Sequence, residues 1–148
     1  MPRETARRSV LLAGLGMALG ALARPSAAAA MPQPGAPARI DWAARPLRLM
    51  VVEARGCAGS AAWRREVGPG YAGSAAGRAA PILAVDFDGP FPDGLVLAAR
   101  PRVTPSFLLL HKGVELSRLE GYGGPRAFEA RIAAMLERAA GSRRELRR

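Results

Sequence analysis

The 148-residue sequence contains a single cysteine and a single histidine. One cysteine excludes an internal disulfide and any zinc or iron–sulfur site that needs several cysteines. A copper or zinc site needs two or three thiolate or imidazole ligands close together, and Cys57 and His111 are far apart in the sequence. We therefore expect no bound metal and no cofactor. Apolar residues make up 49% of the chain, so it is not a disordered polypeptide, and its length allows one domain.

The sequence also lacks an apolar run that would cross a bilayer comfortably as a helix. The uncharged run at residues 10–23 spans 14 residues, whereas a transmembrane helix needs about 20. This run follows Arg3, Arg7 and Arg8 and precedes a stretch of alanines, which is typical of a secretory signal peptide. We therefore predict that residues 1–30 are a signal peptide, that the protein is periplasmic or otherwise exported, and that no stable transmembrane span remains after cleavage.

The export route stays open. Arg7 and Arg8 resemble the pair of a twin-arginine signal, but such pairs also arise by chance in an arginine-rich chain. An N-terminal anchor that is not cleaved would equally place the domain outside the cytoplasm.

Acidic residues are fewer than basic ones, and the net charge is +10. More than half of this excess lies at the two ends, because residues 1–30 carry +3 and residues 138–148 carry +4. A nucleic-acid binder concentrates its charge on one folded face. The +3 that remains over residues 31–137 therefore gives no reason to expect a nucleic-acid partner.

Composition divides the exported part into three segments. Residues 31–46 contain four prolines and are expected to be a flexible lead-in. Residues 47–140 hold the apolar patterns of a folded domain. Residues 141–148 are basic and have no apolar periodicity, so we expect a frayed tail.

The folded segment alternates between strand and helix patterns. Short apolar or alternating runs predict four strands, at residues 47–53, 81–87, 106–111 and 114–120. Helices are expected at residues 57–67 and from Pro125 onward, with a loop that has room for one helical turn at residues 71–80 and a short helical turn at residues 94–100. A helical crossover makes the first two strands parallel, and a two-residue turn makes the last two a hairpin. This order predicts an α/β fold with a mixed four-stranded sheet flanked by helices.

Cys57 is the best candidate for chemistry. It follows a buried strand and opens a helix, whose unpaired N–H groups and partial positive charge favour a thiolate. Arg55 adds positive charge nearby, whereas Glu53 opposes ionisation if it lies close. From its position alone, Cys57 could equally be an inert core residue. Pro105 stands at the start of a strand, where proline is tolerated in either the trans or the cis form.

These elements together resemble a thioredoxin over nearly the whole folded segment. The matching segments are Gly-Cys-Ala-Gly-Ser at residues 56–60, Val-Thr-Pro-Ser-Phe at residues 103–107 and Gly-Tyr-Gly at residues 121–123. The pattern Gly-Cys…Trp-x-x-Glu-Val-x-Pro-x-Tyr over residues 56–71 is similar to periplasmic thioredoxin-like proteins of the sulfur-oxidation (Sox) type.

The resemblance implies a thioredoxin-like domain at residues 47–140 and a role for each matching residue. Cys57 corresponds to the attacking cysteine of the Cys-x-x-Cys motif, and Pro105 to the cis-proline that packs opposite that thiol. Thr104 corresponds to the residue whose backbone binds a substrate strand. Ser60 stands where the family has its resolving cysteine, so the motif is Cys-x-x-Ser.

A hydroxyl cannot attack a mixed disulfide, so this chain cannot complete a dithiol cycle alone. We expect either a monothiol that exchanges disulfides with periplasmic proteins or small thiols such as glutathione, or a protein that has lost redox turnover. In the second case the groove beside Pro105 would bind a peptide or partner protein by strand addition. The hydroxyl of Ser60 could still donate a hydrogen bond to the Cys57 thiolate.

Other polar residues are weaker candidates. His111 is expected to be solvated or packed, and Trp63 to pack in the core rather than contact a substrate. Asp86, Asp88 and Asp93 surround a loop, where solvated carboxylates are common.

Overall fold

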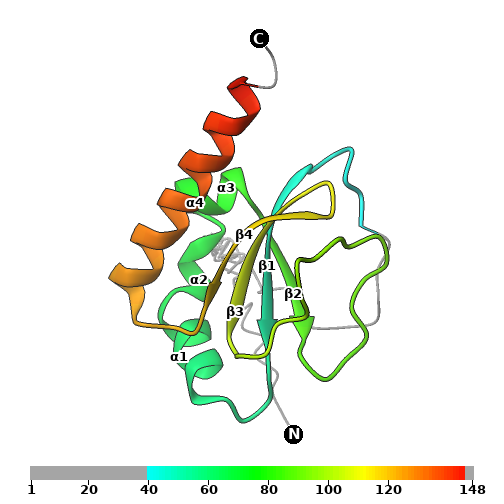
Figure 1. Ribbon diagram of the computed structural model, residues 1–148. Helices are drawn as coiled ribbons and strands as arrows, with labels where there is room; N and C mark the ends of the chain where they lie inside the picture. Colours follow the sequence, from blue (N-terminus) through cyan, green and yellow to red (C-terminus); the bar gives the residue numbers. More distant parts are fainter. Residues whose placement is uncertain (1–39, 146–148) are drawn as a thin grey trace, which may run out of the picture.

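The computed structural model describes residues 40–145. The predicted signal peptide, the first part of the lead-in and the last three residues lie outside this range. Figure 1 shows a sheet with helices along one side. The elements in chain order are β1 (Leu47–Glu53), α1 (Ala58–Glu66), α2 (Gly68–Tyr71), α3 (Ala75–Ala79), β2 (Ile82–Asp86), β3 (Ser106–His111), β4 (Val114–Glu120) and α4 (Pro125–Glu145).

The sheet has the strand order β2-β1-β3-β4. β1 pairs in parallel with β2, and the β1–β3 and β3–β4 pairs are antiparallel. The predicted α/β fold with a mixed four-stranded sheet is thus confirmed. The register that matters most for the site pairs Val52 with Ser106, because it places the end of β1 beside the start of β3.

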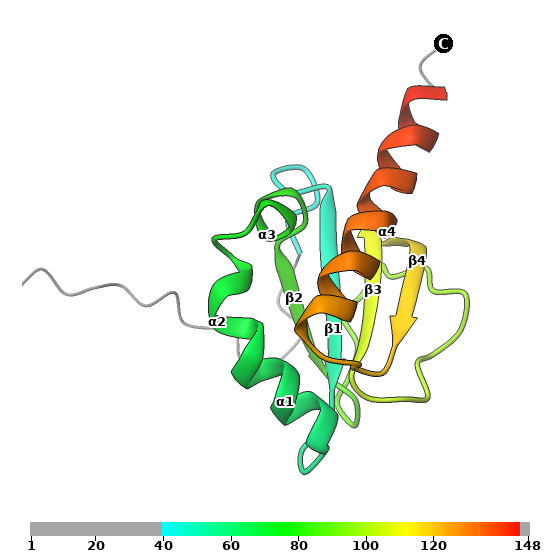
Figure 2. The ribbon, with the colours of Figure 1, turned by 90° about the vertical axis from the view of Figure 1, so that its left-hand side faces the viewer.

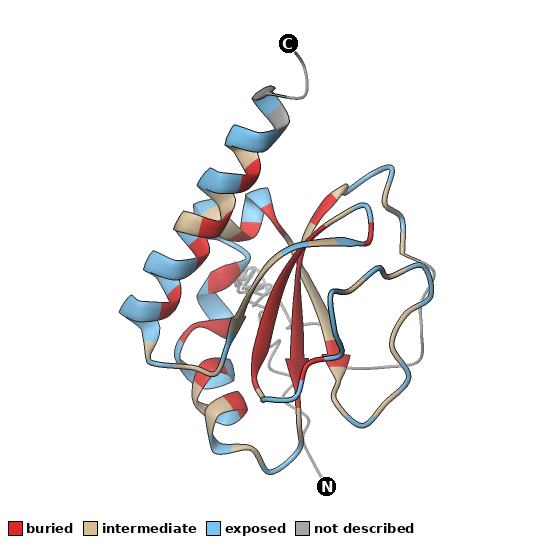
Figure 3. Cartoon of the chain, in the orientation of Figure 1, coloured by how far each residue is buried: buried red, intermediate tan, exposed pale blue. Residues whose placement is uncertain are grey.

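The two central strands explain why their sequences are almost continuously apolar. β1 and β3 are buried on both faces, and they appear as the red strands of Figure 3. β4 lies at the edge and is mostly half-buried or exposed. The turn between β3 and β4 uses Lys112 and Gly113, both at positive φ (50° and 86°), which suits a two-residue hairpin.

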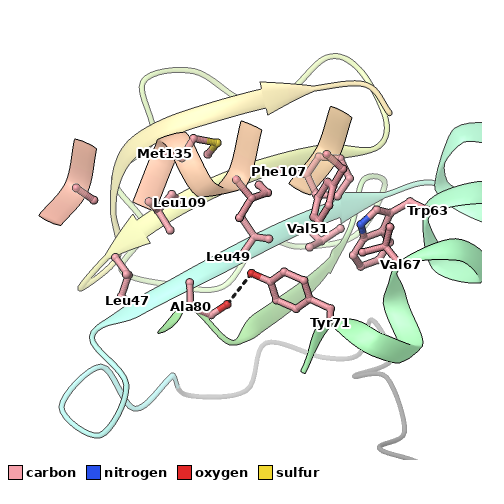
Figure 4. Packing of buried hydrophobic residues seen from close by; sticks show 13 residues of the cluster. Leu47, Leu49, Val51, Trp63, Val67, Tyr71, Ala80, Phe107, Leu109 and Met135 are labelled. Atoms are coloured by element: carbon pink, nitrogen blue, oxygen red, sulfur yellow. Dashed lines mark hydrogen bonds between the residues drawn. The ribbon is translucent and has the colours of Figure 1, made fainter. Parts of the chain in front are cut away.

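All four helices cover one face of the sheet (Figures 1 and 2). The core beneath them contains an aromatic group in which the ring of Phe128, on α4, lies 4.8 Å from Phe107 and 6.2 Å from Trp63. Figure 4 shows this core, with the hydroxyl of Tyr71 donating to the carbonyl of Ala80 at 3.0 Å. Burial raises the pKa of Tyr71.

The other face of the sheet is covered by irregular segments. Its buried residues are Met50, Val52, Val85, Leu108 and Leu110. The side chains packed on them are Trp42, Leu83, Phe87, Phe91, Leu95 and Leu97, most of which belong to the lead-in or to the long connection between β2 and β3. The carbonyl of Pro46 also accepts from the backbone N–H of Lys112 at 2.7 Å. Trp42 and Pro46 therefore attach the end of the lead-in to the domain, although the residues between them are mostly exposed.

The expected helical turn at residues 94–100 is wrong. Val96 instead forms a parallel bridge with Val114, and its backbone bonds to Gly113 and Glu115 at 2.9 Å each. Arg118 holds the same segment by donating to the carbonyl of Ala99 at 2.7 Å. The connection is extended at Val96 because it pairs with the first residues of β4 and covers that part of an edge strand.

Two helical regions also differ from expectation. The stretch at residues 71–80, predicted as a loop with room for one helical turn, contains the end of α2 and the five-residue helix α3, whose N-cap Ser74 accepts from the N–H of Gly77 at 3.0 Å. α4 continues to Glu145, into the segment predicted to be a frayed tail. Apart from Gly141 that stretch contains no helix breaker, and arginine favours a helix and its C-terminal end.

Gly77 should be essential for the tight α2–α3 packing. A Cβ atom there would lie 1.8 Å from the carbonyl oxygen of Tyr71, which is backbone and cannot rotate away. We expect Gly77→Ala to lower the free energy of unfolding by roughly 1–3 kcal/mol in denaturant titrations. Gly70→Ala is the matched control, because nothing lies within 4 Å of its Cβ position. Equal stability of the two variants would contradict the packing described here.

Candidate functional site

Cys57 stands at the N-cap of α1. Figure 1 shows the end of β1 and the start of α1 at the same end of the sheet. A turn at Gly56, with φ of 73°, redirects the chain, and the carbonyl of Cys57 then accepts from the N–H of Ala61 at 3.0 Å. No side-chain oxygen caps this helix. The free N–H groups of its first turn are therefore available to the sulfur of Cys57.

The segment before β3 lies against the sulfur. The Cys57 thiol donates to the carbonyl of Thr104, with 3.2 Å between Sγ and the oxygen. The Thr104–Pro105 peptide bond is cis, and Pro105 is buried. The carbonyl of Pro105 accepts from the N–H of Gly121 at 2.8 Å, and the hydroxyl of Ser106 donates to the carbonyl of Val103 at 2.6 Å. Thr104 and Pro105 are thus fixed beside Cys57.

Hydrogen bonds lower the pKa of Cys57 from 9.0 to about 7. The largest cause is a bond with the Thr104 side chain, followed by bonds with the hydroxyl and the backbone N–H of Ser60 and a smaller one with the N–H of Gly59, while burial opposes them. These donors stabilise a thiolate. The Thr104 carbonyl accepts only from the protonated thiol, so Thr104 contacts the sulfur in both states.

This result changes the role expected for nearby charges. Neither Arg55 nor Glu53 is among the causes of the lowered pKa. Glu53 is instead 3% exposed and forms an ion pair with Arg64 at 3.2 Å, which ties the end of β1 to α1. Arg55 is 96% exposed and points into solvent.

Ser60 lies in the first turn of α1 and is 1% exposed. Its Oγ has no hydrogen-bond partner among the described residues while Cys57 is protonated, and its hydroxyl and N–H become donors to the sulfur once the thiolate forms. A buried hydroxyl without a hydrogen-bond partner lowers the stability of a protein by about 1–3 kcal/mol. Ionisation of the Cys57 thiol provides the missing acceptor and therefore relieves this cost.

Gly59 explains how closely α1 approaches the proline. A Cβ atom at this position would lie 3.0 Å from Cδ of Pro105 and 3.9 Å from Sγ of Cys57. The absence of a side chain at Gly59 therefore permits the close contact between α1 and Pro105. Sequence reasoning missed this role, although a glycine inside a helix signals a close approach.

The remaining candidates do not join the site. Trp63 packs in the core, with its ring 5.4 Å from that of Phe107. Asp86 accepts from the N–H of Asp88 at 3.0 Å within its own loop. His111 lies at the far end of β3, beside the hairpin turn. Within residues 40–145 no three His, Cys, Asp or Glu side chains gather as metal ligands. No helix in that range is long and apolar enough to span a membrane.

Comparison with known proteins identifies the family. The chain is similar to the periplasmic thioredoxin SoxS from Paracoccus pantotrophus in its reduced form, with 40% sequence identity and a TM-score of 0.61 over 63% of this chain and 98% of that one. The chain belongs to the thioredoxin-like superfamily. A thioredoxin from Malassezia sympodialis is also similar, with 16% identity and a TM-score of 0.42 over 62% of this chain and 76% of that one. No protein-family model and no curated protein matches.

The predicted relation to thioredoxin-like proteins of the Sox type is confirmed by this similarity. A thioredoxin fold together with a thioredoxin relative supports a redox function in thiol–disulfide exchange in general terms. The chain nonetheless carries one cysteine, with Ser60 three residues after Cys57.

Because the pKa of Cys57 is lowered to about 7, the rate at which iodoacetamide alkylates this thiol should rise with pH around a midpoint near 7. Ser60→Ala should shift this midpoint upward, because a donor to the thiolate is lost. Ser117→Ala is the control, since it removes another buried hydroxyl without a partner from the middle of β4. A midpoint that is the same in all three proteins would contradict a role for Ser60.

The same pKa shift predicts a pH-dependent stability. Folding depresses the pKa from 9.0 to about 7, so the stabilisation by the thiolate is complete above pH 9 and is lost as the pH falls through 7. The free energy of unfolding of the reduced protein should rise between these values. Cys57→Ala should lose that rise, whereas an identical rise in the variant would assign it to other groups.

Proposed function

We propose that this protein is an exported monothiol exchanger in which Cys57 is the nucleophile and no internal thiol resolves the adduct. The observation that carries the proposal is the sulfur of Cys57 at a helix N-terminus, 3.2 Å from the Thr104 carbonyl, with its pKa near 7. About half of such thiols are ionised at neutral pH, and the thiolate is the reactive form. The side chain is partly exposed, so a disulfide can reach it.

The proposed reaction consists of two successive thiol–disulfide exchanges, with no net oxidation or reduction of the protein. The Cys57 thiolate attacks one sulfur of a disulfide, forms a mixed disulfide and releases the other half as a thiolate. A second thiol, from a partner protein or a small thiol, loses its proton to solvent and attacks the captured half as a thiolate. A new disulfide forms between these two groups, and Cys57 leaves as the thiolate. Thr104 and Pro105 position the incoming chain, and Ser60 stabilises the thiolate before attack and after release.

Ser60 determines that the second exchange must be external. In a Cys-x-x-Cys protein the second thiol attacks the mixed disulfide from within the same chain. The Ser60 hydroxyl occupies that position here and cannot displace a thiolate. The mixed disulfide of Cys57 should therefore persist until an outside thiol arrives.

Export is part of the proposal. The predicted signal peptide at residues 1–30 supports it, as does the periplasmic location in the name of the Paracoccus pantotrophus relative. The partners would then be thiols and disulfides of proteins in that compartment, or small thiols.

Ser60→Cys provides a direct test. After reaction with 2-hydroxyethyl disulfide, the native chain should keep a stoichiometric adduct on Cys57, measured by mass spectrometry without added thiol. In Ser60→Cys the adduct should be released at least about 100-fold faster, because attack within one chain has a high effective concentration. The variant should then lose two hydrogens as a disulfide forms. Ser60→Ala is the control and should keep the adduct.

The opposite results would identify other functions. A native Cys57 that reacts no faster than the cysteine of the urea-unfolded chain would overturn the proposal. Retained capture of a native partner by a Cys57→Ala variant would then favour strand binding in the groove beside Pro105.

A further inference from the structure

An exposed arginine precedes each of the two segments that meet at the Cys57 sulfur. Arg55 precedes Cys57 by two residues, and Arg102 precedes Thr104, whose carbonyl is 3.2 Å from the sulfur, by the same interval. Two residues of extended chain span at most about 7 Å. Each guanidinium can therefore reach a molecule that is joined to the sulfur.

These two charges are poorly neutralised. Asp86 approaches Arg55 only to 4.0 Å, which is too long for a charge-assisted hydrogen bond. Arg102 makes no ion pair with any residue between positions 40 and 145. Arg55 is 96% exposed and Arg102 is exposed as well, so both guanidinium groups are available to a partner.

Two acidic groups near this end of the sheet already have basic partners, and a third lies beside an arginine. Glu53 pairs with Arg64 at 3.2 Å, and Glu120, at the end of β4, pairs with Arg118 at 3.3 Å. The exposed Asp88 is flanked by the guanidinium of Arg100, which donates to the carbonyls of its two neighbours, Phe87 and Gly89, at 3.0 and 3.4 Å. Among residues 40–145, Arg55 and Arg102 are thus the two exposed cations next to the site that have no acidic partner closer than 4.0 Å.

Side-chain bulk does not restrict access to the sulfur. The residues around it in sequence are Gly56, Ala58 and Gly59, and the first two are exposed. Such small residues provide little steric selection between disulfides. Charge is then the main property by which this part of the molecule can distinguish one disulfide from another.

We propose that Cys57 prefers disulfides that carry a carboxylate close to the attacked sulfur, with Arg55 and Arg102 as the recognition groups. This proposal rests on the proposed function and names its substrate class. A thiolate without such neighbours is repelled by an anionic disulfide and prefers a cationic one. Two exposed guanidinium groups within reach of the bound disulfide reverse that order, because they pair with its carboxylate as it approaches.

The test compares three small disulfides of similar size at pH 7: 3,3′-dithiodipropionate (anionic), 2-hydroxyethyl disulfide (neutral) and cystamine (cationic). At low salt the anionic reagent should react with Cys57 at least about 3-fold faster than the cationic one, and 1 M salt should remove this preference. The Arg55→Gln/Arg102→Gln double variant should lose it, whereas Arg131→Gln, at an exposed site on α4, should keep it.

Two outcomes separate this inference from the proposed function. An anionic disulfide that reacts more slowly than the neutral one, or a preference that survives in the double variant, overturns the charge selection alone. A neutral disulfide that reacts no faster than with the unfolded chain overturns the exchange function itself.

A second comparison distinguishes the sources of the carboxylate. Glutathione disulfide and the disulfide of a cysteine peptide with flanking aspartates both belong to the proposed class, and both should lose rate in the double variant. A larger loss for glutathione disulfide identifies a small thiol as the partner, and a larger loss for the peptide identifies an acidic protein segment. No loss with either reagent contradicts the proposal.

Discussion

The contact between the Cys57 sulfur and the Thr104 carbonyl is the interaction on which the site depends. It joins the N-terminus of a helix to a loop that is 47 residues further along the chain, over 3.2 Å. The register that pairs Val52 with Ser106 brings these segments to the same end of the sheet. Gly59 then allows α1 to approach Pro105 without a clash. Strand pairing, helix packing and thiol chemistry therefore share one geometry.

The sulfur also completes a helix that has no other cap. Serine, threonine or aspartate normally accepts from the first N–H groups of a helix. Here Cys57 occupies that position, and the N–H groups of Gly59 and Ser60 contribute to its lowered pKa. A proton or a covalent bond on the sulfur removes its charge and weakens this cap. The chemical state of Cys57 thus affects the stability of the first turn of α1.

Much of the fold could be predicted because its signals are local. The central strands are continuous apolar runs, the hairpin turn is two residues long, and Pro125 begins the last helix. The path of residues 94–100 could not be predicted, because it depends on the edge of β4, which is distant in sequence. Cys57 and Pro105 could be singled out by pattern and resemblance, whereas the Glu53–Arg64 pair and the packing of Gly59 appear only in three dimensions.

The cover of the second sheet face has a consequence for the site. The connection that lays Phe87, Phe91 and Leu97 on this face is the same segment that ends at Thr104 and Pro105. Nothing helical stiffens it between β2 and β3. The anchoring of these apolar side chains therefore sets how firmly the carbonyl of Thr104 is held against the sulfur. A substitution that loosens the packing on this face of the sheet should therefore also change the pKa of Cys57, although the two sites are far apart in the sequence.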